Sequence, residues 1–143
     1  MTVDDNGLEI LSRAQCLELL ATRPVGGVAL TRNALPTILP VTYGLLGSDV
    51  VFATGAGSKY LAVPRETVIA FEVDDVDPVS RSGWSVLAVG VAGHLDEDDP
   101  DWAAAMALDL HPWVGRRAEG LIRLRTDHLS GRRLTGQPFP VGG

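Results

Sequence analysis

The sequence predicts a mainly β domain of the α+β class, built as a small β-barrel with short flanking helices. Five or six segments have the length and the apolar or alternating pattern of strands, and turn residues separate them. Helical patterns are few and do not alternate regularly with the strands, which argues against a doubly wound parallel sheet. The 143 residues suit one domain, expected over 1–134, with a flexible tail over 135–143.

The N-terminal part is predicted to be one helix followed by a meander of strands. Ser12 and Gln15 form a capping-box pattern, so the helix is expected to begin after Ser12. Pro24 disfavours helix in the residue before it, so the helix is expected to end near Arg23. The strands expected next are 25–31, 36–46 and 50–53, joined by turns at 32–34 and 47–49.

The rest of the chain is predicted from the same patterns. Alternating apolar residues indicate a strand over 67–73, and a run that is apolar on both faces indicates a central strand over 84–93. The other elements expected are a short helix over 59–63, a polar loop over 74–83, a helix over 98–110 and a last strand or hairpin over 119–133.

Composition excludes several function classes. The net charge of −6 argues against a nucleic-acid partner, which requires a basic face. Because no apolar run approaches about 20 residues, no membrane span is expected. The acidic N-terminus lacks the pattern of a secretory signal, so a cytoplasmic location is expected. The single cysteine, Cys16, excludes an internal disulfide and is predicted to be buried in the first helix.

Metal-dependent and nucleophilic chemistry find no support in the sequence. The three histidines, His94, His111 and His128, are far apart and have no carboxylate or cysteine at metal-ligand spacing, so no metal site is expected. There is no Gly-x-Ser-x-Gly elbow. No side chain stands out as a catalytic acid or base, and the catalytic residues remain unknown.

The turn Phe52-Ala53-Thr54-Gly55-Ala56-Gly57-Ser58-Lys59 is a candidate phosphate site. It leaves a strand and opens a helix, where glycines allow close backbone approach and free amides point at an anion. Lys59 is the only lysine, against eleven arginines. The Walker A spacing is absent, which disfavours nucleotide triphosphate hydrolysis. Spacing alone favours a simpler alternative, in which Ser58 caps the helix and Lys59 points into water.

Two further features attract attention. Pro40 interrupts the strand Leu39-Pro40-Val41-Thr42-Tyr43, where it belongs at an edge or bulge and leaves backbone groups free for a ligand. Taken by itself, the segment is better explained as an ordinary edge strand. Trp84 and Trp113 lie near turns, where an aromatic ring covers a cofactor, anchors a dimer or packs in a core.

Taken together, these segments resemble the pyridoxamine 5′-phosphate oxidase-like, FMN-binding split-barrel proteins over nearly the whole chain. The motifs that carry the resemblance, in order, are Leu39–Tyr43, Phe52–Gly55 with Gly57–Lys59, Ala70–Asp74 and Gly83–Val86. The resemblance implies a split β-barrel of the FMN-binding type and a homodimer with FMN in clefts between the subunits.

The resemblance also implies a set of cofactor-binding positions. The residues are Leu39, Pro40, Val41, Thr42, Tyr43, Ala53, Thr54, Ser58, Lys59, Trp84, Ser85, Trp113 and Arg132. The first five would line the edge of the isoalloxazine ring through backbone groups, and Thr54, Ser58 and Lys59 would hold the phosphate. Both tryptophans, Ser85 and Arg132 would close the site, partly from the partner chain.

Two departures narrow the implied function. The basic Arg-x-x-x-Leu-Lys segment of true pyridoxamine phosphate oxidases is replaced by Thr37–Thr42, and their Arg-Leu-His-Asp-Arg motif by Arg132–Gly136. These losses argue against vitamin B6 oxidation and leave the deazaflavin F420 open as the cofactor. The resulting hypothesis is an FMN-dependent oxidoreductase for an unidentified small molecule. The alternatives are an F420-binding reductase and a non-catalytic flavin-binding or interaction dimer.

Overall fold

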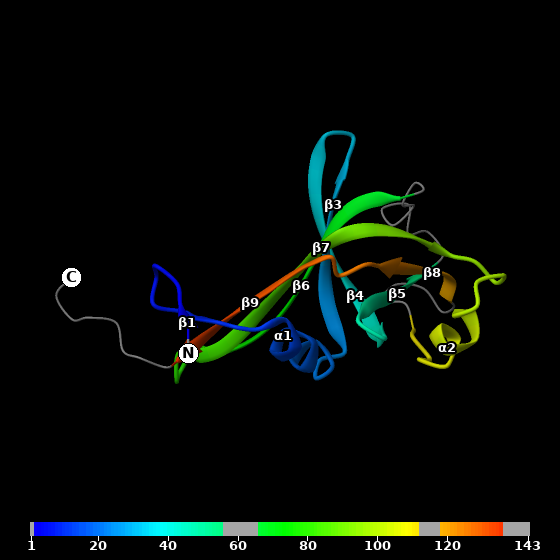
Figure 1. Cartoon of the computed structure of the whole chain (residues 1–143). Coiled ribbons are helices and arrows are strands. Elements are labelled where there is room, and N and C mark those ends of the chain that lie inside the picture. Colours follow the sequence, from blue (N-terminus) through cyan, green and yellow to red (C-terminus); the bar gives the residue numbers. More distant parts are fainter. Residues whose placement is uncertain (1, 56–65, 112–117, 136–143) are drawn as a thin grey trace.

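The structure is a computed structural model that describes residues 2–55, 66–111 and 118–135. The elements in chain order are β1 (Thr2–Val3), β2 (Glu9–Ile10), α1 (Arg13–Leu20), β3 (Val25–Arg32), β4 (Leu35–Leu46), β5 (Asp49–Gly55), β6 (Thr67–Asp77), β7 (Ser82–Leu95), α2 (Trp102–Met106), β8 (Ala118–Leu124) and β9 (His128–Thr135). Strands β7, β6, β3, β4, β5 and β8 close into an antiparallel barrel, and β9, β2 and β1 extend the sheet beyond it (Figure 1). This confirms the predicted mainly β split barrel.

Strand β7 closes the barrel because one of its edges changes partners along its length. Residues 82–89 pair with β9, whereas residues 92–95 pair with β8. Between these segments, a Cβ atom on Gly90 would lie 1.9 Å from the carbonyl oxygen of Arg125, in the chain that connects β8 to β9. Only glycine therefore fits at the position where the barrel splits.

Two apolar clusters hold the fold together. The larger one fills the barrel, where Phe52 and Phe71 are fully buried, and α1 adds Cys16 and Leu20 to it. The capping box at Ser12 and the burial of Cys16 are thus confirmed. The smaller cluster lies on the outside of β5 and β8, where α2 covers Val51, Ala53 and Leu121.

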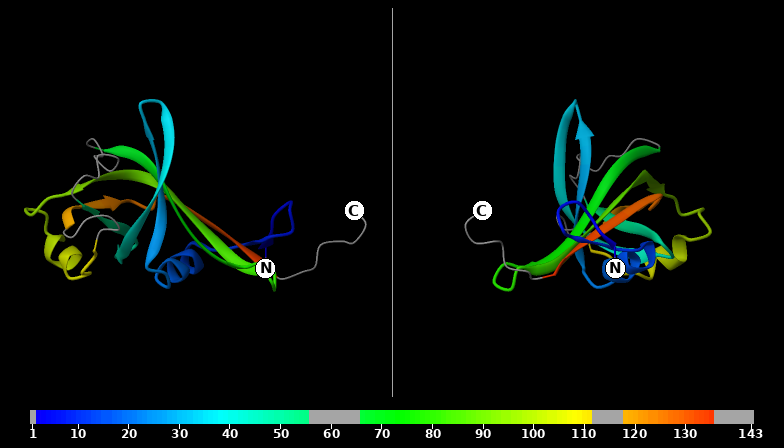
Figure 2. Two further views of the ribbon diagram at one scale, coloured as in Figure 1. Left: turned by 180° about the vertical axis from the view of Figure 1, so that it is seen from behind. Right: turned by 60° about the vertical axis from the view of Figure 1, so that its left-hand side comes forward.

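Two parts of the sheet project from the barrel, as both views in Figure 2 show. One is the far end of the β3–β4 hairpin. The other is an arm formed by the distal ends of β6, β7 and β9, with β1 and β2 beside it. No helix within the described ranges is long and apolar enough to cross a membrane.

Three predicted elements differ from the structure. The polar loop expected over 74–83 is wrong: β6 continues to Asp77 and β7 begins at Ser82, because the two strands stay paired down to these residues. The segment 119–133 contains two strands that do not pair with each other, since β8 joins β5 while β9 joins β2. The helix expected over 98–110 covers only Trp102–Met106, and it starts late because the carboxylate of Asp99 accepts a hydrogen bond from the Asp101 amide at 2.8 Å in the turn before it. The helix expected over 59–63 lies outside the described residues.

Candidate functional site

The first half of β4 has one unpaired edge. Residues 35–42 of this strand pair with β3, and pairing with β5 is confined to Tyr43–Leu46. Among the described residues, no strand pairs with the other edge of 35–42. Strand β5 continues beyond Phe52, away from β4, to the beginning of the predicted phosphate turn. The open edge of β4 therefore starts beside the residues that lead into that turn.

The direction of the β4 backbone groups follows from one hydrogen bond. The amide of Tyr43 donates to the carbonyl oxygen of Pro24 at 3.1 Å, on the β3 side. Since successive residues of an antiparallel strand point their backbone groups to alternate edges, the amides of Ile38 and Thr42 face the open edge. Pro36 and Pro40 share this direction and have no N–H group, so their ring nitrogens cost no ladder hydrogen bond there.

The side chains of the predicted segment 39–43 also alternate. Val41 and Tyr43 are buried inside the barrel, and Leu39 packs against the same core. Pro40 and Thr42 point to the outside. Of these five residues, only Pro40 and Thr42 therefore present backbone groups to the open edge. Ile38, which was not among the predicted residues, presents a carbonyl and an amide there, as Thr42 does.

The side chain of Tyr43 makes its contacts with α1 and the barrel core. Its hydroxyl donates a hydrogen bond to the carbonyl oxygen of Leu20 at 2.5 Å, and its ring meets Phe71 edge-on with centroids 4.9 Å apart. Burial raises the pKa of Tyr43 to about 12. The side chain thus joins α1 to the barrel and is turned away from the open edge.

The described start of the phosphate turn is tightly packed. Ala53 is buried beneath α2, and Thr54, 8% exposed, donates a hydrogen bond to the carbonyl oxygen of Gly120 at 3.2 Å. A Cβ atom on Gly120 would lie 3.2 Å from the Thr54 hydroxyl and 3.8 Å from Nδ1 of His94. The Thr54 proton is therefore already used within the sheet. The predicted residues Ser58, Lys59 and Trp113 lie outside the described residues.

The remaining predicted residues, Trp84, Ser85 and Arg132, lie near the start of β7, far from Thr54. Leu95, at the other end of β7, pairs with β8 beside the Thr54–Gly120 contact. Trp84 is eleven residues away from Leu95, and eleven residues of strand span about 36 Å. Trp84 packs against the barrel core, whereas Ser85 points to the outer face of the sheet beside Arg132. Within one chain, the structure does not bring these residues near Thr54.

A polar hollow of about 880 Å³ lies near the described start of the predicted phosphate turn, because His94, one of its lining residues, is close to Gly120, the hydrogen-bond partner of Thr54. Its lining includes Glu66, Gly93, His94, Asp99, Arg123 and Arg125. Sequence reasoning missed this hollow because it combines side chains from β7, β8 and the loop after β7, which only the barrel closure brings together.

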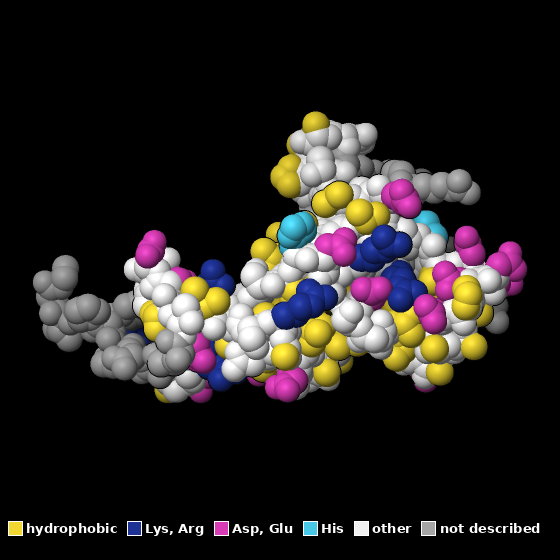
Figure 3. Space-filling view, in the orientation of Figure 1, with side chains coloured by type: hydrophobic (Ala, Val, Ile, Leu, Met, Phe, Trp, Pro, Cys, Tyr) yellow, Lys and Arg dark blue, Asp and Glu magenta, His cyan; other side chains and the backbone are white. Residues whose placement is uncertain are grey.

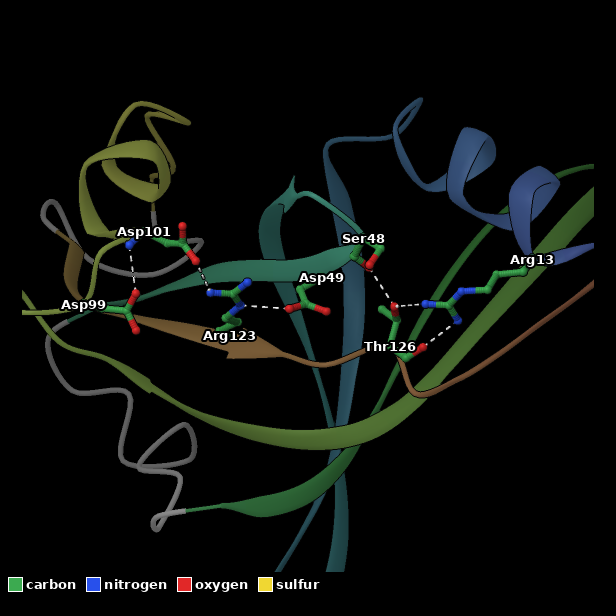
Figure 4. Close-up of polar contacts among 7 residues, drawn as sticks. All are labelled: Arg13, Ser48, Asp49, Asp99, Asp101, Arg123 and Thr126. Carbon is green, nitrogen blue, oxygen red and sulfur yellow. Dashed lines mark hydrogen bonds and ion pairs between the residues drawn. The ribbon is translucent and has the colours of Figure 1, made fainter.

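The guanidinium of Arg123 fixes one wall of the hollow (Figure 4). It donates to Asp49 at 2.9 Å and to Asp101 at 2.8 Å, and the bond to Asp101 makes the largest contribution to a raised pKa for Arg123. Both its described contacts are with acids of the same chain. Figure 3 shows basic and acidic side chains interleaved over this side of the barrel. No group of three metal-ligating side chains occurs within the described residues.

The comparisons with known proteins agree with this architecture. The family model for pyridoxamine 5′-phosphate oxidase matches residues 12–133. Rv0080 of Mycobacterium tuberculosis, described as an uncharacterized protein, is 33% identical over 129 residues, which cover 87% of this chain and 84% of that protein.

Two solved structures are similar over nearly their whole length. A FAD-binding protein of Mycobacterium smegmatis has a TM-score of 0.73 and 30% identity, covering 87% of this chain and 96% of that one. A Corynebacterium glutamicum protein provisionally named a pyridoxamine 5′-phosphate oxidase has a TM-score of 0.74 and 25% identity, covering 90% and 98%. The chain therefore belongs to the pyridoxamine 5′-phosphate oxidase family.

Proposed function

We propose that this protein binds a flavin nucleotide between two copies of the chain and acts as an oxidoreductase on a small molecule. The observation that carries the proposal is the open edge of β4 beside the start of the Gly-rich turn. The amides of Ile38 and Thr42 and the carbonyl oxygens of this edge match the alternating acceptors and donors of an isoalloxazine ring. The bound flavin would supply the redox chemistry, and the chain would orient it.

The phosphate end of the cofactor is assigned to the turn. Ser58 and Lys59 follow the buried Thr54 anchor and supply a hydroxyl group and a positive charge, which suit a phosphate monoester. Because Thr54 donates to Gly120, its role is to hold the start of the turn, and its hydroxyl oxygen can still accept a hydrogen bond.

We include a second copy of the chain because, within a single chain, the expected site residues lie far apart. Ser85 and Arg132 lie at the far end of β7 from Thr54, so an antiparallel partner would bring its own Ser85 and Arg132 to the turn. Arg132 is held by an ion pair with Asp4 at 3.0 Å, which fixes its direction on the arm.

FMN is the first candidate cofactor, and the polar hollow favours FAD as a second. The hollow lies near Thr54, at the described start of the turn, and has a volume within the range of about 300–1,000 Å³ that small-molecule sites occupy. The Mycobacterium smegmatis relative is named as FAD-binding. F420 is the third candidate, because the basic groups of vitamin B6 oxidases are missing.

The test is a set of binding titrations with FMN, FAD, riboflavin and F420, together with the absorption spectrum of the purified protein. Lys59→Ala is expected to weaken FMN about tenfold or more and riboflavin little, because only FMN carries the phosphate. Arg23→Ala, at an exposed ion pair with Asp75, is the matched control and should leave both affinities unchanged.

Each result has a defined meaning. Equal weakening of FMN and riboflavin by Lys59→Ala would remove the phosphate role of the turn, and tighter binding of FAD than of FMN would select the dinucleotide. A protein that binds none of these cofactors would refute the proposal. Reduction of the bound cofactor by a nicotinamide donor, followed by reoxidation by an acceptor, distinguishes an oxidoreductase from a binding module.

A further inference from the structure

One end of the barrel carries two polar side chains that flank a glycine. Phe52 and His94 both pair with Ile122, which lies between them on β8, and Thr54 pairs with Gly120 on the same strand. Phe52 and Ile122 are fully buried in the barrel. Because side chains alternate along a strand, Thr54 and His94 point to this same inner face. They therefore lie on either side of Gly120 at the end of the core.

The missing side chain of Gly120 leaves a small space between them. A Cβ atom at this position would lie 3.2 Å from the hydroxyl oxygen of Thr54 and 3.8 Å from Nδ1 of His94. Apart from the chain neighbours of Gly120, no other described residue has an atom within 4 Å of that point. A ligand atom placed there therefore meets one hydroxyl oxygen and one imidazole nitrogen.

The hydrogen bonds that these two side chains already make decide which ligand group fits. Thr54 donates its proton to the Gly120 carbonyl at 3.2 Å, so its oxygen is left as an acceptor. His94 is exposed and lines the polar hollow, and in the part of the chain that the structure describes its side chain has no hydrogen bond or ion pair. A hydroxyl group fits both, because it can donate to Thr54 and accept from a protonated Nδ1. A phosphate oxygen has no proton to give to Thr54.

The space over Gly120 lies between the two parts of the proposed cofactor site. Strand β5 separates from β4 after Phe52, where the open edge assigned to the ring begins. Beyond Thr54 the chain enters the turn assigned to the phosphate. In a flavin nucleotide, the group that joins the ring to the phosphate is the ribityl chain, which carries a row of hydroxyl groups. Riboflavin, FMN, FAD and F420 all contain this chain.

We propose that Thr54, Gly120 and His94 form a subsite for one hydroxyl group of the ribityl chain. The inference rests on the proposed function, but it does not depend on which of the candidate cofactors is bound. The ligand hydroxyl donates to the Thr54 oxygen and accepts from Nδ1–H of His94, and Gly120 provides the room. His94 is thus a cofactor-binding residue that the sequence does not reveal, because only the closure of the barrel brings β7 to this position.

Fluorescence titrations of the full chain with lumiflavin, riboflavin and FMN test the subsite, since lumiflavin has the ring without the ribityl chain. His94→Ala should weaken riboflavin and FMN equally, by about three- to tenfold for one hydrogen bond, and leave lumiflavin unchanged. His94→Asn should restore most of the affinity, because its amide can donate from nearly the same position as Nδ1. His128→Ala, at an exposed histidine of β9, is the matched control and should change none of the three affinities.

Gly120→Ala tests the space itself. The φ of Gly120 is negative, so alanine is compatible with this backbone, and its methyl group would occupy the place of the ligand hydroxyl. Riboflavin and FMN should weaken at least as much as in His94→Ala, again with lumiflavin unchanged. An unchanged circular dichroism spectrum would show that the fold is intact.

Other results overturn the inference in distinguishable ways. If His94→Ala weakens FMN but not riboflavin, His94 holds the phosphate, and if it weakens lumiflavin equally, His94 acts on the ring or through the fold. Unchanged affinities in both variants would remove the subsite. In all three cases the proposed cofactor site survives. If the protein binds F420 and no flavin, the 5-deaza forms of riboflavin and lumiflavin make the same comparison. A natural protein that binds none of these ligands would refute the proposed function as well.

Discussion

Arg13, at the start of α1, makes two hydrogen bonds to Thr126, in the short connection between β8 and β9. Its guanidinium donates to the Thr126 carbonyl at 2.7 Å and to the Thr126 hydroxyl at 3.0 Å. The same hydroxyl donates to the carbonyl oxygen of Ser48 at 2.7 Å, in the β4–β5 turn (Figure 4). Three segments that are far apart in the sequence thus meet at one buried side chain, where the barrel splits.

Thr126→Val should therefore destabilise the fold with little change in shape. The substitution leaves the Ser48 carbonyl without its donor and removes one partner of Arg13, so the free energy of unfolding should fall by about 1–3 kcal/mol. Urea denaturation followed by circular dichroism measures it. Thr2→Val, at an exposed position of β1, is the control, and an equally stable Thr126→Val would contradict the assigned contacts.

Gly90→Ala tests the closure of the barrel. A Cβ atom 1.9 Å from the Arg125 carbonyl oxygen must push two backbone segments apart, so the loss should be at least about 3 kcal/mol or prevent folding. Gly93→Ala is the matched control three residues along β7, where the nearest atom to a Cβ is 3.9 Å away. Thermal unfolding compares the two, and similar melting temperatures would refute the close approach.

Tyr43 should make stability depend on alkaline pH. In the unfolded chain its hydroxyl ionises near pH 10, whereas in the fold it stays protonated up to about pH 12. The stability that this raised pKa contributes is complete below pH 10 and is lost as pH rises towards 12. The free energy of unfolding should fall by up to about 1.4 kcal/mol per pH unit over this range. Urea unfolding at pH 9 to 11.5 should show the free energy of unfolding falling with this slope in the natural protein. In Tyr43→Phe the slope should be smaller by the contribution of Tyr43. Equal slopes would disprove the burial effect.

The ion pair between Arg123 and Asp101 should couple α2 to β8. A double-mutant cycle with Arg123→Gln and Asp101→Asn is expected to give a coupling of about 0.5–1 kcal/mol that decreases with added salt, because the pair is only partly shielded from solvent. The exposed pair Arg23 and Asp75 provides the comparison and should couple more weakly. A coupling of zero for the first pair would show that α2 is held by its apolar contacts alone.

Local patterns were sufficient to predict the elements whose structure is decided locally. The Ser12 capping box located the start of α1, and alternating apolar residues located the first part of β6. The mostly polar segment Asp74–Asp77 gave no such pattern, and it forms a strand because β7 lies opposite it. The position of a glycine can mark such pairing: a Cβ atom on Gly83 would lie 2.3 Å from the Asp75 carbonyl oxygen.

The sequence was sufficient to predict the kinds of residue in the candidate site, but not the direction in which their backbone groups point. The sequence indicates an interrupted strand at Pro40, yet which amides face outward depends on the pairing of Tyr43 with Pro24, which is a property of the hairpin. Likewise, no pattern in the sequence reveals that Ser85 lies at one end of β7 while Thr54, on β5, lies near the other end, because the register of β7 against two different strands decides it.

The prolines of the open β4 edge have a further consequence. An exposed strand edge normally invites a strand from another molecule, and repeated addition leads to polymers. At this edge every second residue faces outward, and Pro36 and Pro40 remove the donors from two of those positions. An incoming strand would find gaps in the ladder, whereas the proposed cofactor ring would need only the donors of Ile38 and Thr42. The two prolines thus protect this edge against strand addition while they leave two amide donors in place.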